Sequence, residues 1–411
     1  MAEENNWTNF MWNYKSRISD IFSTDGITGV HRFVFKNLDE WKKVPLNIAI
    51  TGNSGVGKSS FINTLKGTFA DDEDGARADV VQCTEKPTPY VHPTNKNLIL
   101  WDLPGVGTPT LPRESYLEKM NFKIYDCFII ISACRFTEND LWLAKAIVEK
   151  NESFNKDERK SFYFVRTKID YDLSSHKKSH RNPEPEENTL KRIRGEIEHE
   201  LKKENFQEMP IYLIENYEKN KYDFGLLTKR LVRESPAEKR EAMALSLSVL
   251  TEELIEAKKN AFEERMWKIC LASACGGAVP LPGFSAAIDG ALLVHEASLY
   301  REQFGLDKEG LERTAQTLTI PIDDLQRTLE LESVGYVLTI RGIITLSTGL
   351  AFTEYIENSA KFTIPVVGSF IAGGVSFYST KYILQKLLGT MVNDAMKIHS
   401  RIRENLQERN H

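Results

Sequence analysis

The segment GNSGVGKSS, Gly52–Ser60, constrains the fold of this 411-residue chain more than any other feature. It matches the pattern G-x-x-x-x-G-K-[ST] and lies between an apolar run, PLNIAIT, and a helical pattern, FINTLKG. The two glycines let the backbone turn tightly around phosphate oxygens with its N–H groups pointing inward. The helix that follows offers its positive N-terminal end to the same anion. The pattern therefore predicts a phosphate-binding loop between a strand and a helix.

Individual residues of this loop have separate expected tasks. Lys58 can reach the β- and γ-phosphates of a nucleotide, which makes it the first expected catalytic residue, and the Ser59 hydroxyl can ligate Mg²⁺. The expected nucleotide-binding residues of the loop are Asn53, Ser54, Gly55, Val56, Gly57, Lys58, Ser59 and Ser60.

A second motif, WDLPG, ends the apolar run NLILWD. A carboxylate at the carboxyl end of a strand can hold Mg²⁺ directly or through water, so Asp102 is the expected second metal ligand. The N–H of Gly105 can meet the γ-phosphate. A D-x-x-G pattern alone is weak evidence, but its position downstream of the loop makes it strong.

A third motif, TKID, predicts which base is bound. The Asp170 carboxylate can accept hydrogen bonds from both N1–H and the exocyclic amine of guanine, and adenine has no matching pair of donors. Lys168 is expected along the plane of the base. Thr167 stands where Asn is more usual and loses the amide contacts of that residue. After the run PIYLIE, Glu215 and Asn216 occupy the place of a last base contact, and Asn216 is the predicted contact.

The segment between the first helix and the next strand must supply a Thr to the metal when γ-phosphate is present. Thr84 is the candidate metal ligand and catalytic residue, because the following PTPYVHP indicates a strand pairing with NLILW, and Thr88 is the alternative. The acidic run DDED, Asp71–Asp74, is interpreted as a solvated loop rather than a metal site.

The residue after D-x-x-G is Val106, whereas many small GTPases have there a Gln that orients the attacking water. The loop also contains no arginine. We expect slow intrinsic hydrolysis that a second molecule accelerates through Gln82 or Glu85, with an unidentified residue acting within the same molecule as the alternative.

Apolar runs alternating with helical patterns divide the chain into three regions. Residues 44–235 predict an α/β domain with a mostly parallel six-stranded sheet and helices on both faces. Residues 1–43 and 236–411 indicate helices, with a boundary near Ser235-Pro236. The polar stretch Ser174–Asn188 is expected to be a surface loop or an insertion.

Composition limits partners and compartment. The net charge of −5 argues against nucleic acid as a partner. The five cysteines form no CxxC pair and indicate buried thiols in a reducing compartment. Two uncharged runs, Ile269–Ile288 and Phe362–Thr380, approach spanning length but contain Gly and Pro, so we interpret them as corners of a helical bundle, with membrane entry as the alternative.

Four segments together resemble the immunity-related GTPases, which are interferon-inducible, dynamin-like GTPases of vertebrates. They are GNSGVGKSSFINTLKG, WDLPGVGTP, YLEKMNFKIYDCFIIISACRFTENDLWLAKAI and FYFVRTKID. The resemblance covers roughly residues 40–235, and Lys58 is typical of the Lys-bearing effector-type members rather than the Met-bearing regulators.

The resemblance implies a Ras-like P-loop GTPase domain and a helical domain built jointly from the N-terminal and C-terminal segments. It also implies Mg²⁺-dependent GTP hydrolysis, GTP-dependent self-assembly, a cytoplasmic location and peripheral action on intracellular membranes, notably vacuoles that enclose pathogens. Two positions depart from the family pattern: Gln82 replaces a Glu implicated in hydrolysis, and Ala78 replaces a Thr. The sequence from 269 onward is less similar to the family.

Two function classes remain open. The first is an assembling GTPase whose nucleotide cycle drives membrane remodelling or attack. The second is a regulatory guanine-nucleotide switch module with little hydrolysis. An ATPase is a third, which TKID opposes.

Overall fold

The structure is a computed structural model, and it describes fourteen stretches of the chain. They are residues 16–17, 20–21, 23–26, 28–30, 32–77, 86–105, 113–133, 137–152, 159–204, 206, 209–248, 251–277, 284–335 and 371–409. Chain contacts divide the molecule into two compact units, one formed by residues 42–254 and one formed by residues 1–41 together with 255–411.

The first unit is built on a six-stranded sheet. Its strands are β1 (Leu46–Thr51), β2 (Thr88–Val91), β3 (Leu98–Asp102), β4 (Cys127–Ala133), β5 (Ser161–Thr167) and β6 (Ile211–Leu213). The spatial order is β2-β3-β1-β4-β5-β6, in which only β2 runs antiparallel to its neighbour. The predicted mostly parallel sheet is confirmed, and so is the pairing of PTPYVHP with NLILW.

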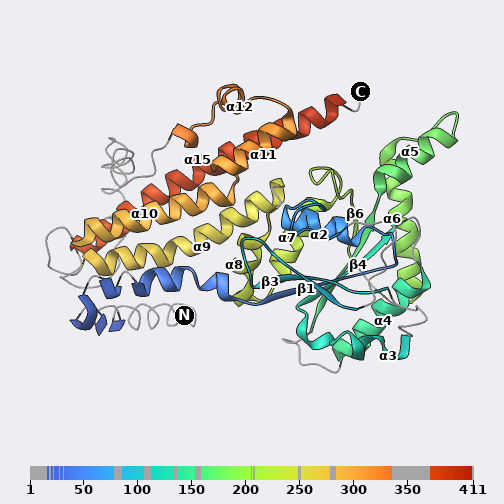
Figure 1. The fold of residues 1–411 in the computed structure, drawn as a ribbon, viewed down its shortest axis with the longest axis horizontal. Coiled ribbons are helices and arrows are strands. Elements are labelled where there is room, and N and C mark those ends of the chain that lie inside the picture. The colour runs from blue at the N-terminus through green and yellow to red at the C-terminus, as the bar shows by residue number, and fades with distance from the viewer. Residues whose placement is uncertain are drawn as a thin grey trace. The chain divides into compact units, whose positions relative to one another are not determined.

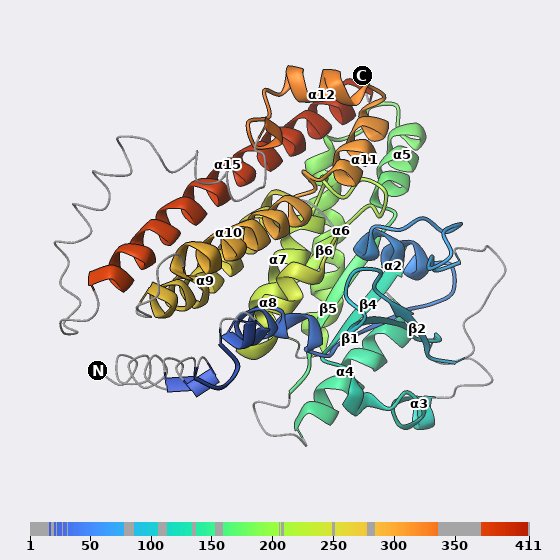
Figure 2. The ribbon, with the colours of Figure 1, turned by 60° about the vertical axis from the view of Figure 1, so that its left-hand side comes forward.

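Helices cover both faces of this sheet (Figure 1, Figure 2). The helices of this unit are α2 (Lys58–Lys66), α3 (Arg113–Lys119), α4 (Glu138–Glu152), α5 (Ile169–Ser179), α6 (Glu186–Lys203), α7 (Phe224–Glu234) and α8 (Ala237–Ser246), with 3-10 turns η1 (Glu40–Lys43) and η2 (Phe122–Ile124). Side chains alternate between the faces of a strand, and β4 is buried on both. Phe128 and Ile130 join the core beneath α3, α4 and α6. Burial on both faces explains the continuous apolar runs in the sequence.

The sheet unit extends to Leu254, past the boundary expected near 235. The reason is that α8 lies against the sheet: Lys239 on α8 donates to Asp126 Oδ1 at 2.7 Å and to the Pro45 carbonyl oxygen at 2.8 Å. Beyond α8, the Ser248 hydroxyl lies 3.0 Å from Nε2 of His92. Pro236 therefore marks the start of helix α8 but not a boundary between units. The contacts of Lys239 and Ser248 place α8 and the residues after it in the sheet unit.

The stretch from Ser174 to Asn188 is not a continuous loop, so that prediction is wrong. Helix α5 continues to Ser179 and α6 starts at Glu186, which leaves a short connection around Pro183 and Pro185. No Gly or Pro interrupts α5 before His180, and polarity alone does not end a helix. The acidic run Asp71–Asp74 is exposed, as expected for a solvated loop.

The second unit is helical and draws on both ends of the chain, which confirms the predicted fold class. It contains α9 (Glu252–Gly277), α10 (Phe284–Gln303), α11 (Lys308–Leu318), α12 (Ile322–Thr328), the 3-10 turn η4 (Ser333–Gly335) and α15 (Ile371–Arg409), of which α9 begins in the sheet unit. A fully buried pair, Arg265 on α9 and Glu296 on α10, joins two helices at 2.7 Å. Arg265 also donates to the Leu38 carbonyl oxygen, which anchors the N-terminal segment.

Several predictions concern residues that the structure leaves undescribed. The first fifteen residues of the predicted N-terminal helical region are among them, as are parts of the runs Ile269–Ile288 and Phe362–Thr380. Within the described ranges, no helix is both long enough and apolar enough to cross a membrane. Cys127 and Cys270 are buried free thiols, in agreement with the prediction for these two cysteines.

Candidate functional site

The predicted phosphate-binding loop connects β1 to α2. Gly52 has φ 147° and Gly57 has φ 94°, conformations that residues with a side chain rarely adopt. A Cβ at Gly52 would lie 2.0 Å from the Ile131 carbonyl oxygen of β4. Glycine is therefore required here by the neighbouring strand as well as by the turn.

Lys58, the first residue of α2, folds back over this loop. Its ammonium group donates to the carbonyl oxygens of Gly52 and Asn53, both at 3.2 Å, and the residue is only 9% exposed. Ser59 and Ser60 follow in the first turn of α2, where backbone N–H groups have no partner within the helix. A buried cation beside a free helix N-terminus is an arrangement that can hold a phosphate chain.

The D-x-x-G motif reaches the same loop. Asp102 ends β3 and is 2% exposed, and it is in register with Ile50 of β1. A Cβ at Gly105 would lie 3.4 Å from the Gly52 carbonyl oxygen, so the two motifs are in close approach. The alternative switch threonine, Thr88, starts β2 in register with Asp102.

Sequence reasoning missed Tyr116, a buried residue of α3. Its hydroxyl donates to the Pro104 carbonyl oxygen at 2.8 Å and lies 3.0 Å from the Thr51 hydroxyl. Tyr116 thus ties the D-x-x-G motif to the end of β1. Burial raises the pKa of its hydroxyl, so it remains a neutral donor. A tyrosine on an amphipathic helix gives no sequence signal for such a contact.

The donor set fits Mg²⁺. The Asp102 carboxylate and the Ser59 hydroxyl are hard oxygen ligands, and Mg²⁺ in phosphate sites takes one or two protein oxygens, with phosphate and water completing its shell. In the described part of the chain, no group of three His, Cys, Asp or Glu side chains could hold a metal alone. The third predicted ligand, Thr84, and the predicted catalytic residue Gln82 lie outside the described residues.

The TKID motif also contacts the loop. The Thr167 hydroxyl donates to the Val56 carbonyl oxygen at 2.6 Å, and Lys168 Nζ donates to the Gly55 carbonyl oxygen at 2.7 Å. The expected loss of side-chain contact at Thr167 is therefore only partial, since its hydroxyl bonds the loop. Lys168 has φ 60° and precedes α5, which starts with Ile169 and the exposed Asp170.

The segment after β6 lies against the first turns of α2. Asn216 Nδ2 donates to the Gly57 carbonyl oxygen at 3.1 Å, and the Asn216 carbonyl oxygen accepts from the Thr64 hydroxyl at 2.8 Å. Four motifs far apart in the sequence therefore meet at one loop. Asn216 is 6% exposed, and its amide group holds this loop rather than projecting freely toward a base.

Glu215 faces the predicted base-reading residue. Burial of Glu215, and then its side-chain hydrogen bond with Asp170, raise its pKa from 4.5 to about 7. Two neighbouring carboxyl groups favour holding one proton between them. Sequence reasoning placed Glu215 near the base but did not show this pairing, which depends on the distance between β6 and α5.

We expect Glu215→Gln to stabilise the nucleotide-free protein at alkaline pH. Between about pH 4.5 and 7, folded Glu215 holds more proton than unfolded Glu215, so its contribution to the free energy of unfolding falls as pH rises. Glutamine does not ionise, so the variant escapes this decline. Melting curves should show a higher melting temperature for the variant than for the original chain at pH 8. At pH 4 the two melting temperatures should be equal. Equal melting temperatures at pH 8 contradict the prediction, and Glu238→Gln, which changes an exposed residue of α8, serves as the control.

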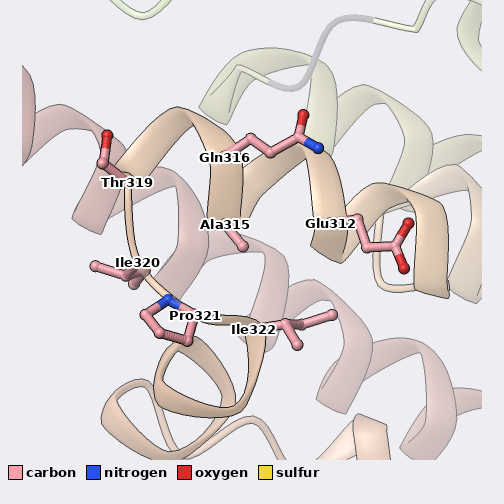
Figure 3. A pocket seen from close by; sticks show the side chains of 7 residues that line it. All are labelled: Glu312, Ala315, Gln316, Thr319, Ile320, Pro321 and Ile322. Carbon is pink, nitrogen blue, oxygen red and sulfur yellow. The ribbon is translucent and has the colours of Figure 1, made fainter.

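The structure also describes a hollow whose lining residues all belong to the helical unit. It has a volume of about 500 Å³ and lies at the α11–α12 corner of the helical unit (Figure 3). Its lining residues are Glu312, Ala315, Gln316, Thr319, Ile320, Pro321 and Ile322. None of them belongs to a predicted nucleotide motif.

Known proteins are similar to this chain over most of its length. The family model described as Interferon-inducible GTPase matches residues 14–401. The T-cell-specific guanine nucleotide triphosphate-binding protein 2 of Mus musculus is 35% identical over 411 residues, covering 97% of this chain and 94% of that protein. Interferon-inducible GTPase 5 of Rattus norvegicus is 33% identical over 353 residues, covering 86% and 74%.

Solved structures resemble the chain less. Era in complex with MgGDPNP and a 16S ribosomal RNA segment aligns with a TM-score of 0.30 and 20% identity, over 46% of this chain and 56% of that chain.

Proposed function

The chain belongs to the interferon-inducible GTPase family, and we propose that it binds GTP with Mg²⁺ at the loop Gly52–Ser60 and hydrolyses it in cell-autonomous defence. Relatives that match most of the length of this chain are named GTPases, and from them it follows that the chain is a GTPase. The observation that supports the proposed site best is the convergence on one loop: Lys58, Thr167 and Asn216 all hydrogen-bond its carbonyl oxygens.

We propose that the phosphate chain lies along this loop. The N–H groups from Asn53 to Ser60 surround it, Lys58 leaves the carbonyl oxygens of Gly52 and Asn53 for the β- and γ-phosphates, and Gly105 meets the γ-phosphate. Ser59, Asp102 and Thr84 would hold Mg²⁺, which would neutralise charge on the phosphates when bound. The contacts of Tyr116 with Pro104 and Thr51 support this, because they position the segment between Asp102 and Gly105.

We propose that the base lies between Lys168 and the segment after β6. Asp170 accepts from N1–H and the amine of guanine, and Asn216 forms the floor where the base meets the loop. The bonds from Thr167 and Lys168 to Val56 and Gly55 support a fixed distance between base and phosphates. A rigid link of this kind lets binding energy at the base hold the reacting phosphate in place.

Hydrolysis requires a group that orients water, and we propose that a second copy of this chain supplies it. Val106 follows the D-x-x-G motif and has no hydrogen-bonding side chain, and the loop has no arginine. Gln82 and Glu85 are the proposed contributors, since both belong to the sequence segment that is expected to respond to the γ-phosphate. The family relationship supports a GTP-dependent homo-oligomer at intracellular membranes, with the protein cytoplasmic between encounters.

We expect turnover per molecule to rise with protein concentration by at least about tenfold, because pairing completes the site. Steady-state phosphate release across a concentration series measures this. Gln82→Ala or Glu85→Ala should remove the concentration-dependent part and leave GDP affinity intact. A rate per molecule that stays constant, with both variants as active as the original chain, contradicts a second-copy mechanism. A constant rate close to zero favours the alternative, a regulatory guanine-nucleotide switch.

A further inference from the structure

Tyr217 is a large aromatic side chain that is 80% exposed and has no task in the site described so far. It directly follows Asn216, whose amide group and carbonyl oxygen are both bonded to the loop–α2 junction. Its backbone is therefore held against the nucleotide motifs, while its ring faces solvent. Because the ring is exposed, it does not contribute to the hydrophobic core, and core packing does not explain why an aromatic residue stands beside this loop.

Both ends of Tyr217 contact groups of the nucleotide site. Its backbone N–H donates to Glu215 Oε1 at 3.0 Å, and Glu215 in turn is hydrogen-bonded to Asp170. Its hydroxyl lies 3.1 Å from the hydroxyl of Ser60 in the first turn of α2. The side chain thus extends from the base-reading carboxylates toward the turn that offers N–H groups to phosphate.

We propose that Tyr217 is a nucleoside-binding residue that covers the ribose and base of the bound guanine nucleotide. The inference rests on the proposed function, since it places the base at Asp170 and the phosphates at the loop. The ring packs against the nucleoside, and the hydroxyl leaves Ser60 to donate to the α-phosphate. Lys168, which is bonded to Gly55, lies along the base from the TKID side.

This assignment is chemically suited to an exposed tyrosine. Aromatic rings pack on bases and sugars without selecting one base, so Tyr217 adds affinity while Asp170 adds specificity. Phenol groups also combine an apolar face with a polar tip, which matches a nucleoside that carries a phosphate at one end. The same ring shields the hydrogen bonds of Asp170 from water and strengthens them.

The test is GDP binding to the full chain, measured by titration calorimetry and by release of labelled GDP. We expect Tyr217→Ala to weaken GDP affinity about tenfold or more and to speed release to match, as loss of an aromatic contact to a base does. Tyr217→Phe should retain most of the affinity and lose only the hydroxyl contribution. Tyr171→Ala, which removes another exposed tyrosine of the same unit, should stay within about twofold of the original chain.

The two hypotheses fail in different ways. If the original chain does not bind GDP, the proposed function is wrong. If the original chain binds GDP and Tyr217→Ala binds equally well, the inference is wrong and the proposed function stands. Equal weakening by Tyr217→Ala and Tyr171→Ala also overturns it, because the effect is then not specific to Tyr217. Melting curves establish that each variant is folded.

Discussion

Replacing Lys58 by alanine is expected to lower GTP turnover by about a thousandfold, the largest effect of any single change in this chain. The ammonium group is buried over the loop, bonded to the carbonyl oxygens of Gly52 and Asn53. No other side chain of the loop Gly52–Ser60 carries a positive charge. Its removal takes away the charge that stabilises the β- and γ-phosphates as negative charge shifts during hydrolysis.

Single-turnover hydrolysis with excess protein measures this effect apart from product release. GTP affinity should fall more than GDP affinity, because part of the lysine contact is to the γ-phosphate. Lys119→Ala, which changes an exposed lysine at the end of α3, is the matched control and should retain full turnover. Turnover in Lys58→Ala within about tenfold of the original chain contradicts the assigned role, because a lost phosphate contact costs more than that.

Asp170→Asn is expected to weaken GTP and GDP binding by at least about a hundredfold. Two hydrogen bonds to a charged acceptor are lost, each worth about 1.5–3 kcal/mol. The amide that replaces the carboxylate also presents N–H to the N–H groups of guanine. Xanthine carries a carbonyl oxygen where guanine has its amine, so the variant should gain affinity for xanthosine diphosphate.

Competition binding with guanine, xanthine and adenine nucleotides measures this change. Glu187→Gln, which removes an exposed charge from α6, should leave all three affinities unchanged. An Asp170→Asn protein with unaltered preference for guanine over adenine contradicts the base assignment. The variant should fold, because Asp170 is exposed and because the change removes the charge repulsion between Asp170 and Glu215.

The sheet could be predicted because its strands are local and strongly patterned. The runs around Ile48, Leu100, Ile129 and Val165 are short, apolar and separated by helical patterns, and each is a strand in the structure. The phosphate-binding loop was predictable for a different reason. Its function needs particular residues at fixed spacing, such as glycine at a positive φ, so chemistry is visible in the sequence itself.

Element ends and unit boundaries were less predictable. Helix α5 runs through a polar stretch to Ser179 because its backbone can continue there until the connection before Pro183. The sheet unit includes α8 because Lys239 bonds Asp126, far away in the sequence. The first outcome depends on the lack of a helix-breaking residue rather than on polarity, and the second depends on a distant contact. Pattern reading therefore assigned the first to a loop and the second to the helical region.

Sequence alone determined the family of this protein and the loop between its first strand and the following helix, and it predicted one carboxylate for a metal and one for guanine. Tertiary structure decided which side chains cooperate. Tyr116 reaches Pro104, Thr167 reaches Val56, and Glu215 meets Asp170 only after the chain has folded. Each of these contacts joins separate segments of the chain. Their distances depend on how helices and strands pack together rather than on any local pattern.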